Sequence, residues 1–192
     1  MYGSGGLFGK SRTTAASQSV PGIWTMEDQI QGARENLWPG PVPTWSISST
    51  GSVDYIRVNG SSVAVSLENL KTAMNDVSFQ NRVGDNTHDF QLANPSGSSF
   101  SFSWNNFNIS TYDRIYLRLQ RVSTFSVNWT VSGTGLTETS GWVSYISTEF
   151  TIPLTAANGS GTFETTNSSY GVLIRDMVLG NSSGTILYVP WI

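Results

Sequence analysis

Hydrophobic and polar residues alternate one by one along much of the chain beyond residue 45. Residues 99–104 read Ser-Phe-Ser-Phe-Ser-Trp, which would place the aromatic residues on one side of an extended strand and the serines on the other. A period of two is typical of a half-buried antiparallel strand. Comparable patterns between turn signals predict further strands at residues 53–58, 62–66, 77–83, 88–92, 114–120, 125–131, 142–152 (one bent strand or two), 171–178 and 185–192.

Many short strands separated by turn signals favour two antiparallel sheets packed face to face. We therefore predict an all-β fold, an antiparallel β-sandwich of the jelly-roll type, for residues 45–192. The Asn59-Gly60 pair predicts a two-residue type I′ hairpin, because both residue types tolerate positive φ. The final predicted strand should be paired, with Trp191 and Ile192 buried.

One segment within the predicted sandwich has helical rather than strand periodicity. Residues 66–76 begin with Ser66, whose hydroxyl can accept a hydrogen bond from a free backbone N–H of the first turn. Leu67, Leu70 and Met74 would then share one face of a short helix. We expect this helix to cover one open end or edge of the sandwich.

The N-terminal part of the chain predicts a second helix, between Gly22 and Pro39. Thr25 is a good N-cap, and Glu27 and Asp28 would follow it at the positive end of the helix dipole. Pro39 disfavours helical geometry in the residue before it and should end the helix. The apolar face would consist of residues at helical spacing, namely Met26, Ile30, Ala33 and Leu37.

These patterns predict three regions. Residues 1–21 are rich in Gly, Ser, Thr and Ala and should form a flexible N-terminal arm. Residues 22–44 contain the docking helix and a proline-rich connector, with three prolines among residues 39–43. Residues 45–192 form the β-sandwich domain.

The arm and helix carry more apolar surface than a short helix can bury by itself. Buried Trp residues are common anchors of protein interfaces, and burial yields about 25 cal/mol per Å² of apolar surface. We therefore expect these residues to bind another subunit or another protein. The predicted partner-binding residues are Leu7, Phe8, Ile23, Trp24, Met26, Ile30, Leu37 and Trp38.

The order of residues around the predicted N-terminal helix resembles a segment found in many virion proteins of tailed phages, including those of aquatic phages. That segment runs Gly-Val-Trp-Ser-Leu-x-Glu-Gln and, after a few residues, Gly-x-Trp-Pro. The matching residues here are Trp24, Thr25, Gln29, Trp38 and Pro39; Met26, Asp28 and Asn36 stand where Leu, Glu and Gly are usual. The resemblance covers about a tenth of the chain and implies a virion structural protein.

We accordingly predict a capsid-surface decoration (cement) protein, made in the host cytoplasm and located at the particle surface. Its partners would be other capsid or tail subunits, and we expect a homo-oligomer. The alternative is a tail fibre, adaptor or receptor-binding protein. A second alternative is a carbohydrate-binding β-sandwich module that recognises a host surface glycan.

The carbohydrate-binding alternative depends on where the aromatic residues lie. Exposed aromatic rings stack on sugars, whereas most large aromatic side chains in a small sandwich belong to its core. The residues that would form a sugar-stacking face are Tyr112, Tyr116, Trp129, Trp142, Tyr145 and Tyr170.

Composition and charge argue against some classes of binding partner. Charged residues make up 12% of the chain, about half the usual share, and the net charge is −3. Basic residues cluster only at Lys10 and Arg12, so nucleic acid is not an expected partner. No apolar run approaches the ~20 residues of a membrane span, and the chain has no cysteine.

Candidate chemistry is sparse. His88 is the single histidine, and only Asp85 and Asp89 accompany it, which falls short of a convincing metal site. Asp54, Asp113 and Asp176 are better explained as strand-end or pairing charges than as a catalytic carboxylate pair. The chain has no nucleophile elbow, phosphate-binding loop or zinc-protease motif. We therefore predict no enzyme activity, no cofactor and no metal.

Overall fold

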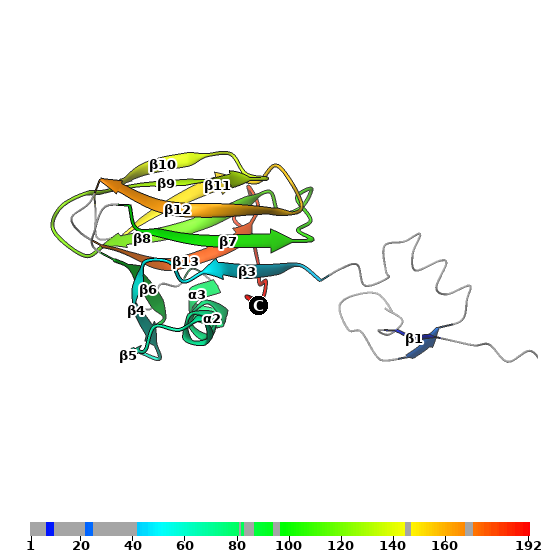
Figure 1. Ribbon diagram of the computed structural model, residues 1–192. Helices are drawn as coiled ribbons and strands as arrows, with labels where there is room; N and C mark the ends of the chain where they lie inside the picture. Colours follow the sequence, from blue (N-terminus) through cyan, green and yellow to red (C-terminus); the bar gives the residue numbers. More distant parts are fainter. Residues whose placement is uncertain are drawn as a thin grey trace, which may run out of the picture. The chain divides into compact units, whose positions relative to one another are not determined.

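The protein is described here from a computed structural model (Figure 1). The described residues are 7–9, 22–24, 42–80, 82, 87–93, 97–144, 147–167 and 171–192, with the backbone alone at 7–9, 22–24, 166 and 167. The chain separates into two compact units, Met1–Val42 and Pro43–Ile192. This division lies two residues before the predicted start of the sandwich domain.

The N-terminal unit contains a short antiparallel pair of strands, β1 (Leu7–Gly9) and β2 (Gly22–Trp24). Leu7 lies opposite Trp24, and Phe8 lies opposite Ile23. The pair therefore connects a part of the predicted flexible arm to the residues just before the predicted N-cap, Thr25. The predicted helix itself lies outside the described residues.

The second unit consists of two antiparallel sheets packed face to face, which confirms the predicted β-sandwich (Figure 1). The five-stranded sheet has the order β10 (Thr139–Val143), β9 (Val127–Thr134), β12 (Gly159–Asn167), β7 (Ser99–Asn105) and β3 (Thr44–Ser49). The seven-stranded sheet has the order β11 (Thr148–Pro153), β8 (Arg114–Arg121), β13 (Val172–Gly180), β6 (Asp89–Leu92), β4 (Val53–Val58) and β5 (Ser61–Val63), with β14 (Ile186–Leu187) beside β13.

The sequence alternation decides which side chains fill the space between the sheets. On β7, Phe100, Phe102 and Trp104 are buried, and the serines between them lie on the outer face. The predicted segment 125–131 follows the same rule from Val127 onward, but Phe125 precedes β9 and is exposed. The turn at Asn59-Gly60 has φ values of 50° and 76°, as the predicted type I′ hairpin requires.

Aromatic rings form the core where the first and last parts of the sandwich meet. Trp45 on β3 stacks on Trp191, with ring centroids 4.9 Å apart and an interplanar angle of 10°. Phe107 meets Trp45 edge-on at 4.7 Å. Next to these rings the backbone N–H of Trp45 donates to the carbonyl of Pro190 at 2.9 Å, and that of Ile192 donates to Trp45 at 2.9 Å. The end of the sandwich thus pairs with its beginning.

The predicted short helix is present as α2 (Leu67–Asn75), and the Ser66 hydroxyl accepts from the backbone N–H of Asn69 at 3.1 Å. Leu70 and Met74 are buried, whereas Leu67, in the first turn, is exposed. The helix contacts β3 of one sheet and β4 and β6 of the other, and so covers one edge of the sandwich (Figure 1). Within the described part of the chain no helix is both long and apolar enough to span a membrane.

The predicted strand at 77–83 is wrong, because residues Val77–Gln80 form a single helical turn, α3. The carboxylate of Asp76 accepts from the backbone N–H of Ser78 at 2.8 Å, which favours a helical start. Phe79 is buried and stacks on Phe90. A short alternating run of residues fits one helical turn as well as a strand.

The predicted strand at 185–192 is only partly a strand. Beyond Leu187 the chain is held by two side-chain amides and by a single parallel bridge between Trp191 and Trp45. The Asn75 amide donates to the carbonyl of Trp191 at 2.9 Å and accepts from its N–H at 2.8 Å. The buried Gln80 amide pairs in the same way with Val189, at 2.9 and 3.2 Å. A carboxamide offers the same donor and acceptor as a peptide group. Trp191 is buried as predicted, whereas Ile192 is 56% exposed.

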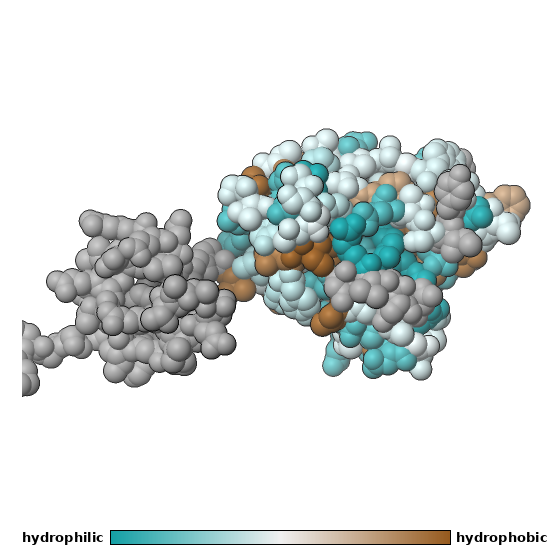
Figure 2. All heavy atoms as spheres, turned by 180° about the vertical axis from the view of Figure 1, so that it is seen from behind, coloured by the Kyte–Doolittle hydropathy of each residue, from teal (hydrophilic) through white to brown (hydrophobic). Residues whose placement is uncertain are grey.

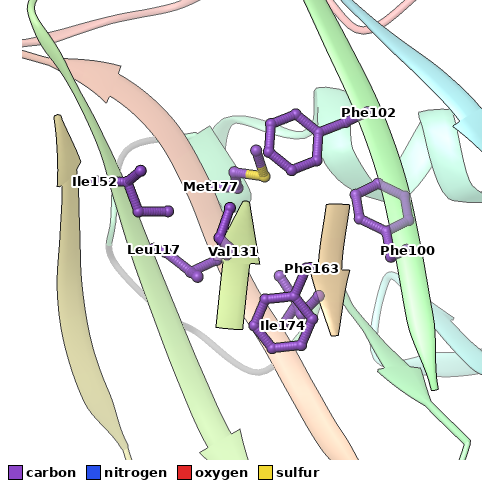
Figure 3. Close-up of a pocket in the computed structure, with 8 residues that line it drawn as sticks. All are labelled: Phe100, Phe102, Leu117, Val131, Ile152, Phe163, Ile174 and Met177. Atoms are coloured by element: carbon purple, nitrogen blue, oxygen red, sulfur yellow. The ribbon is translucent and has the colours of Figure 1, made fainter. Parts of the chain in front are cut away.

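Strand β12 was not predicted, because its sequence Gly-Ser-Gly-Thr-Phe resembles a turn. Its glycines have a packing function: a Cβ atom on Gly159 would collide with the Trp104 ring, and one on Gly161 with the Phe102 ring. Small residues on β12 therefore make space for large rings on the neighbouring strand β7. The remaining space between the sheets includes an apolar cavity of about 10 Å³, lined by eight residues (Figure 3). It has no polar partner for a water molecule and is a packing gap.

The closed aromatic core predicts that residues 43–192 fold without the N-terminal unit. A protein truncated to these residues should be soluble and should unfold in one cooperative transition, because β3, α2 and the C-terminal residues supply each other's contacts. Thermal unfolding followed by circular dichroism, with the full chain as control, tests this. A non-cooperative transition or a molten state would contradict the division into two units.

The amide pairing predicts a strong effect of Gln80→Glu at neutral pH. A buried carboxylate would face the Val189 carbonyl without a donor, and we expect a loss of about 3 kcal/mol in the free energy of unfolding. A protonated carboxyl group can donate again, so the loss should shrink as the pH falls toward 4. Urea titrations at several pH values measure both effects; a loss independent of pH would contradict this role of Gln80.

Candidate functional site

A row of charged side chains crosses the outer face of the seven-stranded sheet, and we call it the charged row. Strand register places Glu149, Arg118 and Asp176 side by side on β11, β8 and β13. Asp89 and Arg57 lie opposite each other on β6 and β4. Arg175, at the irregularity in β13 and next to Asp176 in the chain, pairs with Asp89, so the sign of the charge alternates along the row. The side opposite to that of Figure 1 shows a strongly hydrophilic area in the middle of the domain (Figure 2).

Asp89 is the acceptor at one end of the charged row. The Nη1 group of Arg175 donates to its Oδ2 at 2.6 Å, and Nη1 of Arg57 lies 3.5 Å from the same oxygen. Arg175 also donates from Nε to the Gln120 side chain at 2.9 Å. Arg57 donates from Nε to the Tyr55 hydroxyl at 3.0 Å. Each arginine is thus held by a second group on its own or a neighbouring strand.

Asp176 and Glu149 are the acceptors at the other end. Arg118 donates to Asp176 Oδ2 from Nε at 2.7 Å and also from Nη2. Arg82 donates to Glu149 at 3.1 Å, and its guanidinium carbon lies 4.1 Å from the centroid of the Tyr116 ring. Arg82 follows α3, so this contact connects the helical segment to β8 and β11.

Burial raises the pKa values of Asp89 and Asp176 above the ordinary 3.8, although the adjacent guanidinium groups act in the opposite direction. Both carboxylates have no exposed surface. In each, Oδ1 has no hydrogen-bond partner among the described residues. The charged row therefore contains two carboxylates that lose more hydration than their arginine partners restore, and its acids and bases are engaged mainly with one another.

His88 connects a turn to the helical segment. Its Nε2 accepts from the backbone N–H of Asn59 at 3.2 Å, which assigns the ring proton of the neutral side chain to Nδ1. Nδ1 lies 2.9 Å from the Thr87 hydroxyl and 3.3 Å from Asp76. His88 thus stabilises the Asn59-Gly60 hairpin against the residues between α2 and α3. Across the described residues, no group of three or more potential metal-ligating side chains converges.

The structure does not bring the predicted sugar-stacking residues together. Trp129 is fully buried in the core, and Tyr116 is buried with its hydroxyl donating to the carbonyl of Asn181 at 2.6 Å. Tyr112 is half-buried and packs against the core. Trp142 differs, since half of its surface is exposed. Tyr145 and Tyr170 lie outside the described residues.

Of the eight predicted partner-binding residues, four lie on the β1–β2 pair, namely Leu7, Phe8, Ile23 and Trp24. The other four, Met26, Ile30, Leu37 and Trp38, lie outside the described residues. The prediction that these residues bind a partner is not tested by the structure.

The charged row was not found from the sequence, although Asp176 is a pairing charge, which is one of the two roles predicted for it. It lies in the middle of β13, where every residue is buried. The available signal was the Arg175-Asp176 pair inside an otherwise apolar strand. Adjacent opposite charges there require partners on neighbouring strands, but the sequence does not say which strands those are.

The raised pKa values predict a specific pH dependence. Between pH 3.8 and the raised values, folded Asp89 and Asp176 bind protons more tightly than the unfolded chain does. Their contribution to the free energy of unfolding therefore increases as the pH falls through that window.

We test this with the double variant Asp89→Asn, Asp176→Asn, which lacks both titrating groups. The free energy of unfolding of the natural chain minus that of the variant should rise as the pH falls from 7 toward 4. Urea denaturation at each pH measures the difference, and a fall in that difference over the same range would contradict the proposed effect of burial.

No protein-family model matches the chain, and no curated protein matches it. Among solved structures, TmCBM61 in complex with β-1,4-galactotriose is 12% identical, with 73% of this chain and 88% of that one covered at a TM-score of 0.39. A family 35 carbohydrate-binding module from an environmental isolate is 14% identical, with coverages of 76% and 98% and a TM-score of 0.42. The enzymatically active domain of tailspike protein 4 of bacteriophage CBA120 is 12% identical, with coverages of 76% and 19% and a TM-score of 0.32. At these values the likeness adds nothing to what the residues of this chain show.

Proposed function

We propose that the protein is a virion structural protein that binds the particle through its N-terminal unit and displays the β-sandwich, as a capsid-surface decoration protein. The observation that carries this proposal is the separation of the chain into two units at residues 42 and 43. The sandwich closes on itself through Trp45 and Trp191. The N-terminal unit is therefore available for a function other than completing that core.

The sequence of the N-terminal unit supports attachment. It carries all eight predicted partner-binding residues and the whole of the segment that resembles tailed-phage virion proteins. The β1–β2 pairing holds Leu7 and Phe8 beside Ile23 and Trp24 along the backbone, so four of these apolar residues belong to one local structure. Burying such residues on a partner would supply the free energy of attachment.

The chemistry of the sandwich supports binding rather than catalysis. The Nε2 atom of His88, which a general base would need free, accepts a backbone N–H. The Ser78 hydroxyl lies 3.3 Å from His88 Nδ1, but it donates to Asp76 at 2.6 Å. The carboxylates of the charged row are paired with arginines. These groups are bonded to other parts of the fold, whereas a catalyst would keep them available to a substrate.

A second candidate function is that of a receptor-binding tail protein. The exposed ring of Trp142 on a polar sheet face favours it, because such a ring can stack on a sugar of the host surface. Attachment through the N-terminal unit would be the same in both cases, and the position on the particle distinguishes them.

The attachment proposal predicts that deleting residues 1–42, or changing Trp24 and Trp38 to Ala, lowers the copy number on purified particles at least tenfold. Quantitative mass spectrometry of particles produced with each variant measures the copy number. Phe125→Ala is the matched control, because Phe125 is an exposed aromatic residue of the sandwich, and it should leave the copy number unchanged.

Immunogold labelling of the same particles locates the protein on the capsid or the tail. Normal incorporation of the double Trp variant would show that the sandwich makes the attachment, and the proposal would fail.

A further inference from the structure

The outer face of the five-stranded sheet is covered almost entirely by hydroxyl and amide side chains, and we call it the hydroxyl face. Its residues alternate with buried core residues along each strand, so they lie on the side away from the core. Strand register aligns them in rows across the sheet. The rows are Ser46, Ser103, Ser160 and Thr134; Ser101, Thr162 and Ser132; and Ser99, Glu164, Thr130 and Ser140.

Hydrogen bonds within the rows fix some of these side chains. The hydroxyl groups of Ser101 and Thr162 lie 3.1 Å apart, and so do those of Thr134 and Ser160. Neighbouring strands in a sheet are about 4.8 Å apart, so the rows present hydroxyl groups at regular intervals. Each hydroxyl can both donate and accept, and one mutual bond leaves further capacity for a ligand.

Charge is distributed very unevenly between the two sheets. The five strands below the hydroxyl face carry one charged residue, Glu164. The strands of the other sheet carry Asp54, Arg57, Asp89, Arg114, Arg118, Arg121, Glu149, Arg175 and Asp176. The hydroxyl face is therefore complementary to a neutral, polar surface. Its strands carry Glu164 but no cation, so they offer nothing to attract an acidic ligand.

Among the described residues, Trp142 is the aromatic residue on this face. It lies on the edge strand β10 opposite Asn128, and because the next residue, Val143, is buried, Trp142 points to the outer side. Half of its surface is exposed. An exposed indole ring provides a flat apolar surface for stacking. Asn128 beside it provides an amide that can donate and accept hydrogen bonds.

We infer that the hydroxyl face binds a neutral polysaccharide, with Trp142 stacked on one sugar ring and Asn128 and the hydroxyl rows bonded to sugar hydroxyls. The alternatives fit this face less well. Serine is depleted in protein–protein interfaces, nucleic acid needs cations, and a lipid surface needs a larger apolar area. The inference does not depend on attachment to a virion, so either proposal can fail while the other holds.

Affinity electrophoresis of the full chain tests the inference. Native gels containing soluble neutral polysaccharides (mixed-linkage β-glucan, hydroxyethylcellulose, galactan and dextran) are compared with gels containing alginate, which is acidic, and with gels containing none. We expect at least one neutral polysaccharide to retard the protein and alginate to have no effect.

Two pairs of variants locate the binding surface. Trp142→Ala should weaken binding at least tenfold, whereas Phe125→Ala, which removes an exposed ring from the loop before β9, should bind as the natural chain does. Ser140→Glu places a charge on an exposed position of the face, two residues from Trp142, and should also weaken binding. Thr137→Glu adds the same charge at an exposed loop position before β10 and should have no effect.

Several results would overturn the inference. One is that none of the neutral polysaccharides retards the protein; another is that Trp142→Ala binds as the natural chain does. Retardation by alginate alone would indicate a charged ligand and another site. Sedimentation velocity supplies a further check: self-association lost in Trp142→Ala, without retardation by any neutral polysaccharide, would show that a second copy covers this face.

Discussion

The stacking of Trp45 on Trp191 is the contact on which the arrangement of the sandwich depends. It joins the first strand of the five-stranded sheet to the last residues of the domain, with backbone hydrogen bonds on both sides of Trp45. The Asn75 amide holds Trp191 from the other side, so α2 is fixed by the same contact. Removing either ring would open a space of aromatic size in the core. The contact closes the core within Pro43–Ile192, which is why we regard these residues as a self-contained unit.

Because the core is closed between the sheets, the side chains on the two outer faces of the sandwich can differ in chemistry. One face carries the charged row, whose buried carboxylates lose hydration that paired arginines only partly restore. Buried ion pairs are weak contributors to stability, but each carboxylate accepts only from particular arginines on neighbouring strands. The charged row can therefore fix the register of the sheet at the irregularity in β13. The strands of the other face carry a single charged residue, Glu164, and among the described residues Trp142 is its exposed aromatic residue.

Sequence patterns predicted the parts of this fold that depend on local chemistry. Alternation located most strands, Ser66 marked the start of α2, and Asn59-Gly60 defined a hairpin. The errors arose where distant residues decide the structure. Gly159 and Gly161 lie in a strand because any larger side chain there would collide with rings on β7. Residues 189–191 are held in place by hydrogen bonds from the side-chain amides of Asn75 and Gln80. The partners of Asp176 and Asp89 likewise come from other strands, and no local pattern identifies them.

We assign attachment to the N-terminal unit and ligand binding to a free face of the sandwich. Cryo-electron microscopy of the intact particle tests this division most directly, because one map shows the surroundings of both parts. We expect residues 1–42 to contact another virion protein and the outer face of β7, β12 and β9 to be open to solvent. A map in which that face is buried against a capsid or tail subunit, while residues 1–42 contact no other protein, would contradict it.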